Sequence, residues 1–507
     1  MRFSGRTKQV ALSILVFVLS SEIVWADAPF VLVAGRRDPR AIVIDLDKAL
    51  DPANNGTPNA VISRVRVTPD VDTNGDSFPD APASGLPSNL VIPPNGRFAF
   101  VVNHAGNATP AAVNTFQHGH LGTVAVLDLR EALDPINNNT ANAISALIPT
   151  GFFGPVGLGL TNDGKFALVA NSETNGKEDG AREVSVIDLS QGAPVGTVLL
   201  GFGNGGKIPQ DPGKSCADLI ANPALLQQSL PHKNFGCFPA SNGLGISRRH
   251  GGFAFAANGG TDDVSVIDVD RALSGDPGAE VARIPVERGP WGLAVSPGGG
   301  LIAVTNRESA EGDLSAVGIG TILGTEEGNL ISVIDVERAI AGAANAEIAR
   351  VQVGIDDATK NSRPFSLAFT PNGRQLIVTN FRTNNVSVVD VRKAIDGGIT
   401  GGTSAEVARI PLVKPGGGPA RPRGVAVTPD GRFAVVAGGA ARAGLPLGGN
   451  GAFCDEVPNT DPLDLVPPAS KCGALWVIDL RSNTVVATVT GVGNEPYLVD
   501  ITHGRRH

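Results

Sequence analysis

The chain has little of what marks a helical or a nucleic-acid-binding protein. No stretch of a dozen residues shows helical periodicity outside the N-terminus, and no run of basic residues occurs. The formal net charge is −8, so nothing in the charge points to nucleic acid as a partner. Because hydrophobic residues still make up 42% of the chain, the 64 Gly and 37 Pro indicate many turns and not disorder.

Sequence motifs of catalytic sites are also missing. The chain has no G-x-S-x-G and no H-E-x-x-H motif. The glycine-rich run at 201–207 lacks the Ser or Thr and the strand-to-helix context of a phosphate-binding loop. The seven His residues are too sparse for the inward-facing sets of a multi-copper propeller. We therefore expect no recognisable catalytic residue, and a protein that is more readily a binder than an enzyme.

A strand-like run that ends in two apolar residues and an Asp occurs seven times. The Asp residues are Asp45, Asp128, Asp188, Asp268, Asp335, Asp390 and Asp479. A second apolar run precedes each of these, and a Gly-containing turn with a further strand precedes most of those pairs. Self-similarity of this kind indicates a radial array of small antiparallel sheets. The predicted fold is all-β, a β-propeller of seven four-stranded blades.

The two ends of the chain offer a way to close this ring. The first repeat begins at its second strand, near Phe30, and so lacks an inner strand. The segment from Tyr497 to Ile501 follows Glu495-Pro496 and matches the first strand of other repeats. We expect the C-terminal strand to complete blade 1, because an open array would leave two exposed sheet edges.

Two stretches carry a resemblance to a known family. RPFSLAFTPNGRQLIVTN with NNVSVVDV, and GPWGLAVSPGGGLIAVTN with NLISVIDV, resemble the YVTN-type β-propeller repeat. That repeat occurs in exported bacterial proteins and archaeal surface-layer proteins. The resemblance implies the propeller fold, but propellers of this group include binding proteins, lactonase-like enzymes and quinoprotein subunits.

Residues 1–26 read as a signal peptide. A basic segment is followed by the apolar run Val10 to Leu19 and by a small-residue cleavage pattern that ends at Ala26. A membrane anchor is the alternative, although the apolar run is short for a span. We therefore expect residues 27–507 to form one exported propeller domain, periplasmic or extracellular, with no membrane span after cleavage.

Export makes disulfide bonds reasonable for the four Cys residues. Three pairings are possible. We favour Cys216 with Cys237 and Cys454 with Cys472, because each of these pairs brackets a single insertion between predicted strands. A metal site is less favoured, since neither pair has C-x-x-C spacing.

Strand order places the long insertions on one face of the ring. These insertions are residues 68–88, 104–122, 172–183, 202–241, 307–329 and 439–473. Varied loops on a rigid scaffold commonly carry function, although tolerated drift of loop length is the alternative.

One insertion contains DTNGDSFPD, which resembles the calcium loop of exported bacterial proteins and thrombospondin type 3 repeats. The resemblance implies side-chain ligands from Asp72, Asn74, Asp76 and Asp80, with the carbonyl of Phe78, and Asp70 as a further ligand. Alternating oxygen-bearing side chains suit Ca²⁺, and Ser77 departs from the usual Gly. The alternative is a solvated turn without metal.

On the face that carries the long insertions, the first strand of each repeat starts and the second strand ends close to the predicted channel mouth. Polar and aromatic residues occupy many of these strand ends. A concave mouth of convergent polar groups is a common ligand site, and arginines suit carboxylate or phosphate groups. The candidate ligand-binding residues are Arg36, Asn103, His104, Trp291, Asn306, Arg307, Arg363, Asn380, Arg382, Arg421, Arg423 and Tyr497. These arginines could instead pair with neighbouring acidic loops. His104, His118 and His120 share one insertion, where a solvated loop is favoured over a transition-metal site.

Two function classes therefore compete. The first and favoured one is a non-catalytic exported propeller that binds a protein, a glycan or a small anion on its insertion-rich face, with Ca²⁺ ordering one loop. The alternative is a propeller enzyme, either a lactonase-like hydrolase or a quinoprotein-type oxidoreductase subunit. No organic cofactor is indicated.

Overall fold

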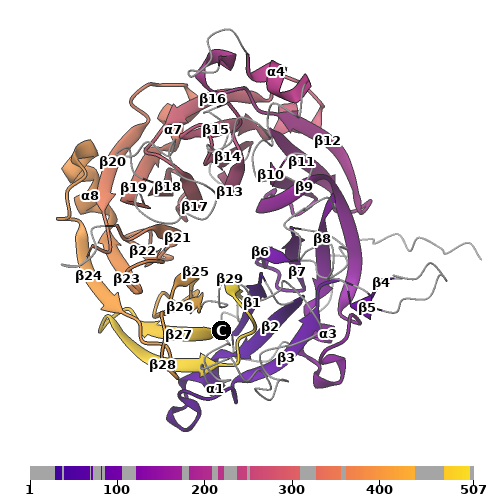
Figure 1. The fold of residues 1–507 in the computed structure, drawn as a ribbon, viewed down its shortest axis with the longest axis vertical. Coiled ribbons are helices and arrows are strands. Elements are labelled where there is room, and N and C mark those ends of the chain that lie inside the picture. The colour runs from indigo at the N-terminus through magenta and orange to yellow at the C-terminus, as the bar shows by residue number, and fades with distance from the viewer. Residues whose placement is uncertain are drawn as a thin grey trace, which may run out of the picture.

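The fold is a ring of antiparallel sheets around a common centre, a β-propeller (Figure 1). The computed structural model describes residues 29–36, 39–68, 70–71, 81–82, 86–104, 121–173, 182–207, 215–221, 237–247, 252–308, 327–355, 361–439 and 473–502. Within these residues the strands form five four-stranded sheets, one seven-stranded sheet and one two-stranded sheet.

The first sheet contains strands from both ends of the chain. Its order is β29 (Pro496–Ile501), β1 (Phe30–Gly35), β2 (Arg40–Asp45) and β3 (Val61–Arg66). Val31 lies opposite Ile501, and Val33 lies opposite Val499. The C-terminal strand therefore supplies the inner strand that the first repeat lacks.

The seven-stranded sheet departs from the expected separate four-stranded sheets. Its order is β12 (Ala193–Leu199), β11 (Glu183–Asp188), β10 (Phe166–Glu173), β9 (Ile144–Leu160), β8 (Leu121–Asp128), β7 (Phe98–Asn103) and β6 (Pro87–Val91). The long strand β9 pairs with β8 through its first half and with β10 through its second half. It is thus the outer strand of one repeat and the inner strand of the next, without a loop between them.

The remaining four-stranded sheets follow in chain order. The first contains β13 (Ser241–Ser247), β14 (Phe253–Asn258), β15 (Asp263–Asp268) and β16 (Glu280–Pro285), and the second contains β17 (Pro290–Val295), β18 (Leu301–Glu308), β19 (Glu327–Asp335) and β20 (Glu347–Gln352). The third contains β21 (Pro364–Phe369), β22 (Gln375–Asn380), β23 (Asn385–Asp390) and β24 (Glu406–Pro411). The fourth contains β25 (Pro422–Val427), β26 (Phe433–Gly438), β27 (Ala474–Asp479) and β28 (Thr484–Thr490). The two-stranded sheet pairs β4 (Asp70–Val71) with β5 (Ala81–Pro82).

The repeated Asp has a structural role. In five repeats it caps a short helix by accepting a backbone N–H from the first turn. The helices are α1 (Leu46–Leu50), α3 (Leu129–Leu133), α6 (Val269–Leu273), α7 (Val336–Ile340) and α8 (Val391–Gly397). Asp188 and Asp479 accept backbone N–H groups in the corresponding turns. One more helix, α4 (Cys216–Ala221), follows β12.

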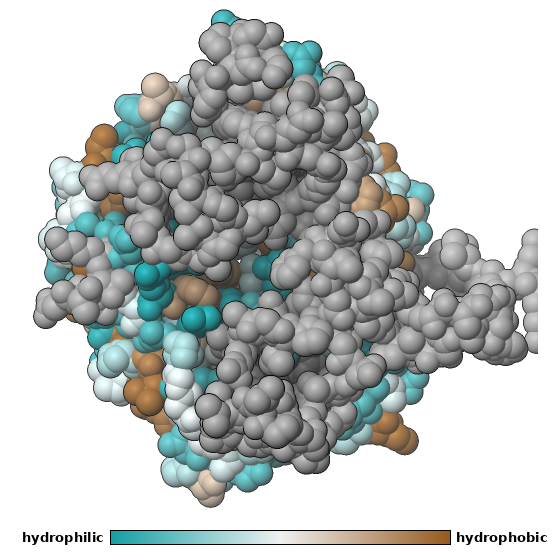
Figure 2. Space-filling model, viewed as in Figure 1, coloured by the Kyte–Doolittle hydropathy of each residue, from teal (hydrophilic) through white to brown (hydrophobic). Residues whose placement is uncertain are grey.

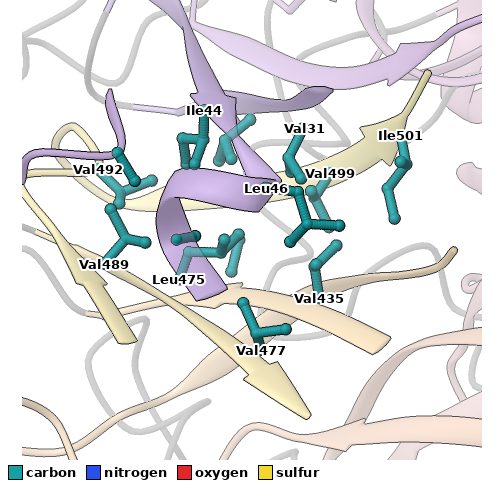
Figure 3. Packing of buried hydrophobic residues seen from close by; sticks show 14 of the residues in the cluster. Val31, Ile44, Leu46, Val435, Leu475, Val477, Val489, Val492, Val499 and Ile501 are labelled. Carbon is teal, nitrogen blue, oxygen red and sulfur yellow. The ribbon is translucent and has the colours of Figure 1, made fainter. Parts of the chain in front are cut away.

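The hydrophobic core lies between neighbouring sheets. In the cluster of Figure 3, Val31 and Ile44 of the first sheet pack with Val435 and Val477 of the last one. Val499 of β29 belongs to the same cluster, so the C-terminal strand joins these two sheets by packing as well as by pairing. In the described part of the chain, no helix is both long enough and apolar enough to cross a membrane.

Candidate functional site

The centre of the ring is lined by an inner strand from every repeat. These inner strands are β29, β6, the second half of β9, β13, β17, β21 and β25, and each contacts the next in that order, β25 contacting β29. A cavity of about 180 Å³ lies among them. Trp291, Phe365, Val156, Asn242 and Tyr497 are among its lining residues.

The inner strands begin with the same unusual backbone. The residue before each strand has a positive φ, between 40° and 61°, and these residues are Leu86, Gly154, Ala240, Gly289, Arg363, Arg421 and Glu495. A positive φ is uncommon for residues other than Gly. The pairing register shifts just after the first residue of each inner strand. Such irregularities re-aim a side chain, and here they recur at one end of the ring.

The second residue of each inner strand, counted in β9 from Pro155, is called the mouth position here. The mouth positions are Ser88, Val156, Asn242, Trp291, Phe365, Arg423 and Tyr497. The next residue is often Gly, because the neighbouring inner strand passes very close. A Cβ at Gly243 would lie 2.5 Å from the carbonyl oxygen of Trp291, and one at Gly292 would lie 2.6 Å from that of Phe365. The mouth positions are therefore held on rigid, tightly packed strands.

Four aromatic rings form a cluster on one side of the mouth. The ring centroid of Phe365 lies 5.8 Å from that of Trp291, 6.1 Å from that of Phe381 and 5.2 Å from that of Tyr497. Aromatic side chains from three inner strands and from the loop after β22 thus meet in one place. In the region that β21, β22 and β25 occupy in Figure 1, Figure 2 shows an apolar group beside hydrophilic residues.

Arginines lie over these rings. The guanidinium carbon of Arg307 is 4.0 Å from the ring centroid of Trp291, and that of Arg36 is 5.3 Å from that of Tyr497. Arg363 and Arg421 lie 5.3 Å and 5.7 Å from the ring centroid of Phe381. Contacts between arginine and aromatic faces are attractive, and they hold the guanidinium groups together on this side of the mouth.

Arg423 is the most buried of the arginines that contact the cluster. Its guanidinium donates to Glu495 at 2.8 Å and to the carbonyl oxygen of Gly439 at 3.1 Å. Burial lowers the pKa of Arg423 from its ordinary value, and the charge of Glu495 opposes that shift. Arg36 and Arg421 add to the lowering, so two further positive charges lie within electrostatic reach of Arg423. Arg423 still carries its charge, because arginine is not deprotonated in proteins.

The predicted asparagines lie in the sheets and not at the mouth surface. Asn103, Asn306 and Asn380 are fully buried. Asn306 donates to Ser332 at 2.9 Å, and Asn380 donates to Ser387 at 2.7 Å. These serines donate to a Glu on the outer strand. The amides are links in buried hydrogen-bond chains across each sheet, which is a structural role.

The remaining predicted residues with described side chains, His104 and Arg382, differ in burial. His104 is buried, and its Nδ1 lies 3.3 Å from the carbonyl oxygen of Pro155. Arg382 is exposed on the loop after β22. His118, His120, residues 72–80 of the predicted calcium loop, Cys454, Cys472 and the predicted signal peptide all lie outside the described residues. For Asp70 the backbone alone is described, in β4. The predicted bond between Cys216 and Cys237 is confirmed.

Sequence reasoning missed two residues of the mouth. Phe381 contacts three arginines, and Glu495 pairs with Arg423. Glu495 could have been found, because it stands before Pro496 as Arg363 stands before Pro364 and Arg421 before Pro422. Phe381 offers no such signal, since only the packing of its loop brings it to Phe365.

A second carboxylate, half-buried, lies further along the strand that carries Tyr497. Asp500 accepts the backbone N–H of Ile92 at 2.8 Å and that of Ile501 at 2.9 Å. Burial raises the pKa of Asp500 to about 6, against the lowering effect of these two hydrogen bonds. The contact ties β29 to the end of β6.

Comparison with known proteins identifies relatives by structure. No protein-family model and no curated protein sequence matches the chain. A periplasmic gluconolactonase of Pseudomonas aeruginosa is similar, with a TM-score of 0.52 and 16% identity over 94% of this chain and 99% of that one. Two putative 6-phosphogluconolactonases are similar too. The protein from Bacteroides fragilis has a TM-score of 0.53 and 13% identity over 95% and 100% of the two chains, and the one from Bacteroides uniformis has 0.51 and 14% over 94% and 100%.

These neighbours correct one expectation. A non-catalytic propeller that binds a protein, a glycan or a small anion was the favoured prediction, and it is wrong on this comparison. The solved structures that match the chain along nearly its full length bear the names of lactonases. These names match the class that stood as the alternative prediction, a lactonase-like hydrolase. At 13–16% identity the likeness itself establishes the shared propeller fold.

Proposed function

We propose that the protein is an exported lactonase-like hydrolase whose site is the mouth of the ring. The observation that carries the proposal is the Arg423–Glu495 pair beside four aromatic rings, of which Trp291, Phe365 and Tyr497 line the cavity. Tyr497 links the two parts, because it lines the cavity and its ring centroid lies 5.8 Å from the Arg423 guanidinium. The names of the structural neighbours support the same chemistry.

Water can act as the nucleophile in lactone hydrolysis. The absence of nucleophile motifs from the sequence is therefore compatible with a lactonase. A base must take a proton from water, and hydrogen-bond donors must stabilise the negative oxygen that forms at the carbonyl. The arginines of the mouth are such donors. The aromatic faces of Trp291 and Phe365 suit the C–H face of a sugar-derived ring.

Glu495 is the base in this proposal. It accepts a proton as water adds to the lactone carbonyl carbon, while an arginine stabilises the oxyanion. The ring C–O bond then breaks, and the proton passes to the leaving alkoxide oxygen, which gives a hydroxy acid. The ion pair with Arg423 holds the carboxylate of Glu495 in place at the mouth.

A pH-stat assay of mature protein on glucono-δ-lactone tests the proposal. Hydrolysis should exceed the buffer rate, and Glu495→Gln should lower kcat by about 10²-fold or more, the usual contribution of a general base. Arg432→Ala is a matched control, because Arg432 lies 4.6 Å over Phe433 at the opposite end of β26 from the mouth. A lactone panel hydrolysed only at the buffer rate would refute the proposal.

We also propose that the ring counts as seven blades closed by the C-terminal strand. The cyclic contacts of the inner strands support this count, with the seven-stranded sheet taken as two blades that share β9. The resemblance to the YVTN repeat accords with it. Export to the periplasm or beyond is supported by the Cys216–Cys237 bond, since disulfides persist in oxidising compartments.

A further inference from the structure

The mouth is chemically one-sided. On β17, β21, β25 and β29 the mouth positions carry Trp291, Phe365, Arg423 and Tyr497. On β6, β9 and β13 they carry Ser88, Val156 and Asn242. The backbone is the same on both sides, with a positive φ before each strand and a register shift after its first residue. The two sides therefore differ in side chains and not in scaffold.

The plain side is as rigid as the aromatic one. Asn89 donates to the carbonyl oxygen of Val156 at 2.9 Å, which ties β6 to β9. A Cβ at Gly157 would lie 2.6 Å from the carbonyl oxygen of Asn242, so β9 and β13 are in close contact. A change of side chain at Val156 therefore alters the space in the cavity while the backbone holds its place. A change at Asn242 also removes its hydrogen bond to the carbonyl oxygen of Ala240, at 2.9 Å.

The order of the inner strands around the propeller places Val156 across the cavity from the aromatic side. From β9, the contacts run through β13 and β17 to β21 in one direction, and through β6 and β29 to β25 in the other. Val156, Asn242, Trp291, Phe365 and Tyr497 line one cavity of about 180 Å³. A cavity of roughly 150 Å³ holds a single benzene ring, so this one accommodates one small ring and few further atoms.

We propose that Val156 and Asn242 determine the substrate specificity of the site by limiting the substituent that a single-ring lactone carries. This proposal rests on the proposed function. The ring lies against Trp291 and Phe365, and its substituent extends toward Val156 and Asn242. A larger residue at Val156 leaves room for the bare ring alone, whereas a smaller residue admits longer substituents.

The test compares a bare ring, δ-valerolactone, with a substituted ring, glucono-δ-lactone. Val156→Phe should lower kcat/KM for the substituted lactone at least tenfold more than for the bare one. Val156→Ala and Asn242→Ala should shift the same ratio in the opposite direction, and they remain informative if the Phe variant does not fold. Val195→Phe is the control, since Val195 is exposed on the outer strand β12. Equal changes on both lactones in all three variants would overturn the proposal.

A binding measurement separates this proposal from the proposed hydrolysis. The chain has three Trp residues; Trp291 lines the cavity, Trp476 is fully buried, and Trp25 belongs to the predicted signal peptide. The probe is glucono-δ-lactam, a ring that the enzyme cannot cleave. It is added to mature protein while the tryptophan fluorescence is recorded, and the variant Trp291→Phe should abolish the change in fluorescence. If no lactone is hydrolysed but Val156→Phe weakens lactam binding tenfold relative to bare δ-valerolactam, the specificity proposal stands and the hydrolase proposal fails. Unchanged lactam selectivity would overturn the specificity proposal whatever the activity.

Discussion

The aromatic side of the mouth and its plain side share one backbone design but carry different chemistry. Both have the positive φ and the register shift, yet among the described residues one side alone gathers rings and guanidinium groups. Each repeat thus provides an equivalent mouth position. A distinct chemical surface forms where the residues at these positions differ from the rest in several neighbouring repeats. Arg423 of β25 and Tyr497 of β29 show this, together with Glu495, which directly precedes β29 and pairs with Arg423.

The largest effect is expected from breaking the ring where the two sides meet at β29. Deleting residues 495–507 removes Val499 and Ile501 from the core, and each such buried side chain contributes about 1.5–3 kcal/mol. The loss of β29 also exposes the edge of β1. We expect loss of cooperative unfolding in a thermal melt followed by circular dichroism.

Deletion of residues 503–507 is the matched control, because it leaves β29 whole. An unchanged melting temperature in the longer deletion would contradict the role of the C-terminal strand.

The ion pair on the aromatic side should give the next largest effect. Arg423→Met leaves Glu495 without its 2.8 Å partner, and removing one member of a buried pair costs about 3–5 kcal/mol. The double variant Arg423→Met with Glu495→Gln should recover part of this loss in urea unfolding. Arg421→Ala should cost under about 0.5 kcal/mol, since Arg421 is exposed. Equal losses at Arg421 and Arg423 would show that burial does not matter here.

Close contact between β13 and β17, where the plain side meets the aromatic side, gives a third prediction. Gly243→Ala places a Cβ 2.5 Å from the carbonyl oxygen of Trp291, which should cost about 1–3 kcal/mol. Gly298→Ala is the control, because nothing lies within 4 Å of a Cβ there. Urea unfolding of both variants checks the difference, and a cost as small at Gly243 as at Gly298 would mean that the strands can move apart.

Asp500 makes the other junction, between β29 and β6, dependent on pH. Its pKa is about 6 in the folded protein against an ordinary 3.8, so the folded state binds the proton more tightly. This stabilising contribution is present below about pH 4 and is lost as pH rises through 6. It amounts to roughly 3 kcal/mol, at about 1.4 kcal/mol for each pKa unit.

Melting curves from pH 4 to 7.5 should therefore show Asp500→Asn gaining stability relative to the natural protein as pH rises. The constant effect of the altered hydrogen bonds to Ile92 and Ile501 does not change that slope. A difference that stays flat across this range would contradict a raised pKa.

The smallest effect concerns the predicted calcium loop, which precedes β6 in the chain. If Asp72 and Asp76 bind Ca²⁺, a tenfold excess of the ion over its Kd should stabilise the protein by roughly 1.4 kcal/mol. The double variant Asp72→Ala with Asp76→Ala should lose this rise in melting temperature. A natural protein indifferent to EGTA, with no bound Ca²⁺ by elemental analysis, would end the calcium proposal.

Pattern in the sequence was a good guide to the strands and a partial guide to the mouth. The seven Asp-terminated runs end at strand ends in every repeat, because alternation and turn residues are local signals. Trp291, Arg307, Arg363, Arg421, Arg423 and Tyr497 were predicted to gather, and contacts with shared rings bring them together. Asn306 and Asn380 also stand where strands end, but their amides turn into the sheet toward Ser332 and Ser387.

Sequence by itself determined the repeat and the strand that returns from the C-terminus, and it favoured the Cys216–Cys237 pair, because each depends on spacing along the chain. Tertiary structure alone decided that β9 serves two repeats, that Phe381 joins the aromatic cluster and that Glu495 pairs with Arg423. These outcomes depend on how closely adjacent strands approach and which side chains meet across them. No local pattern encodes that distance, which arises only when the ring is assembled.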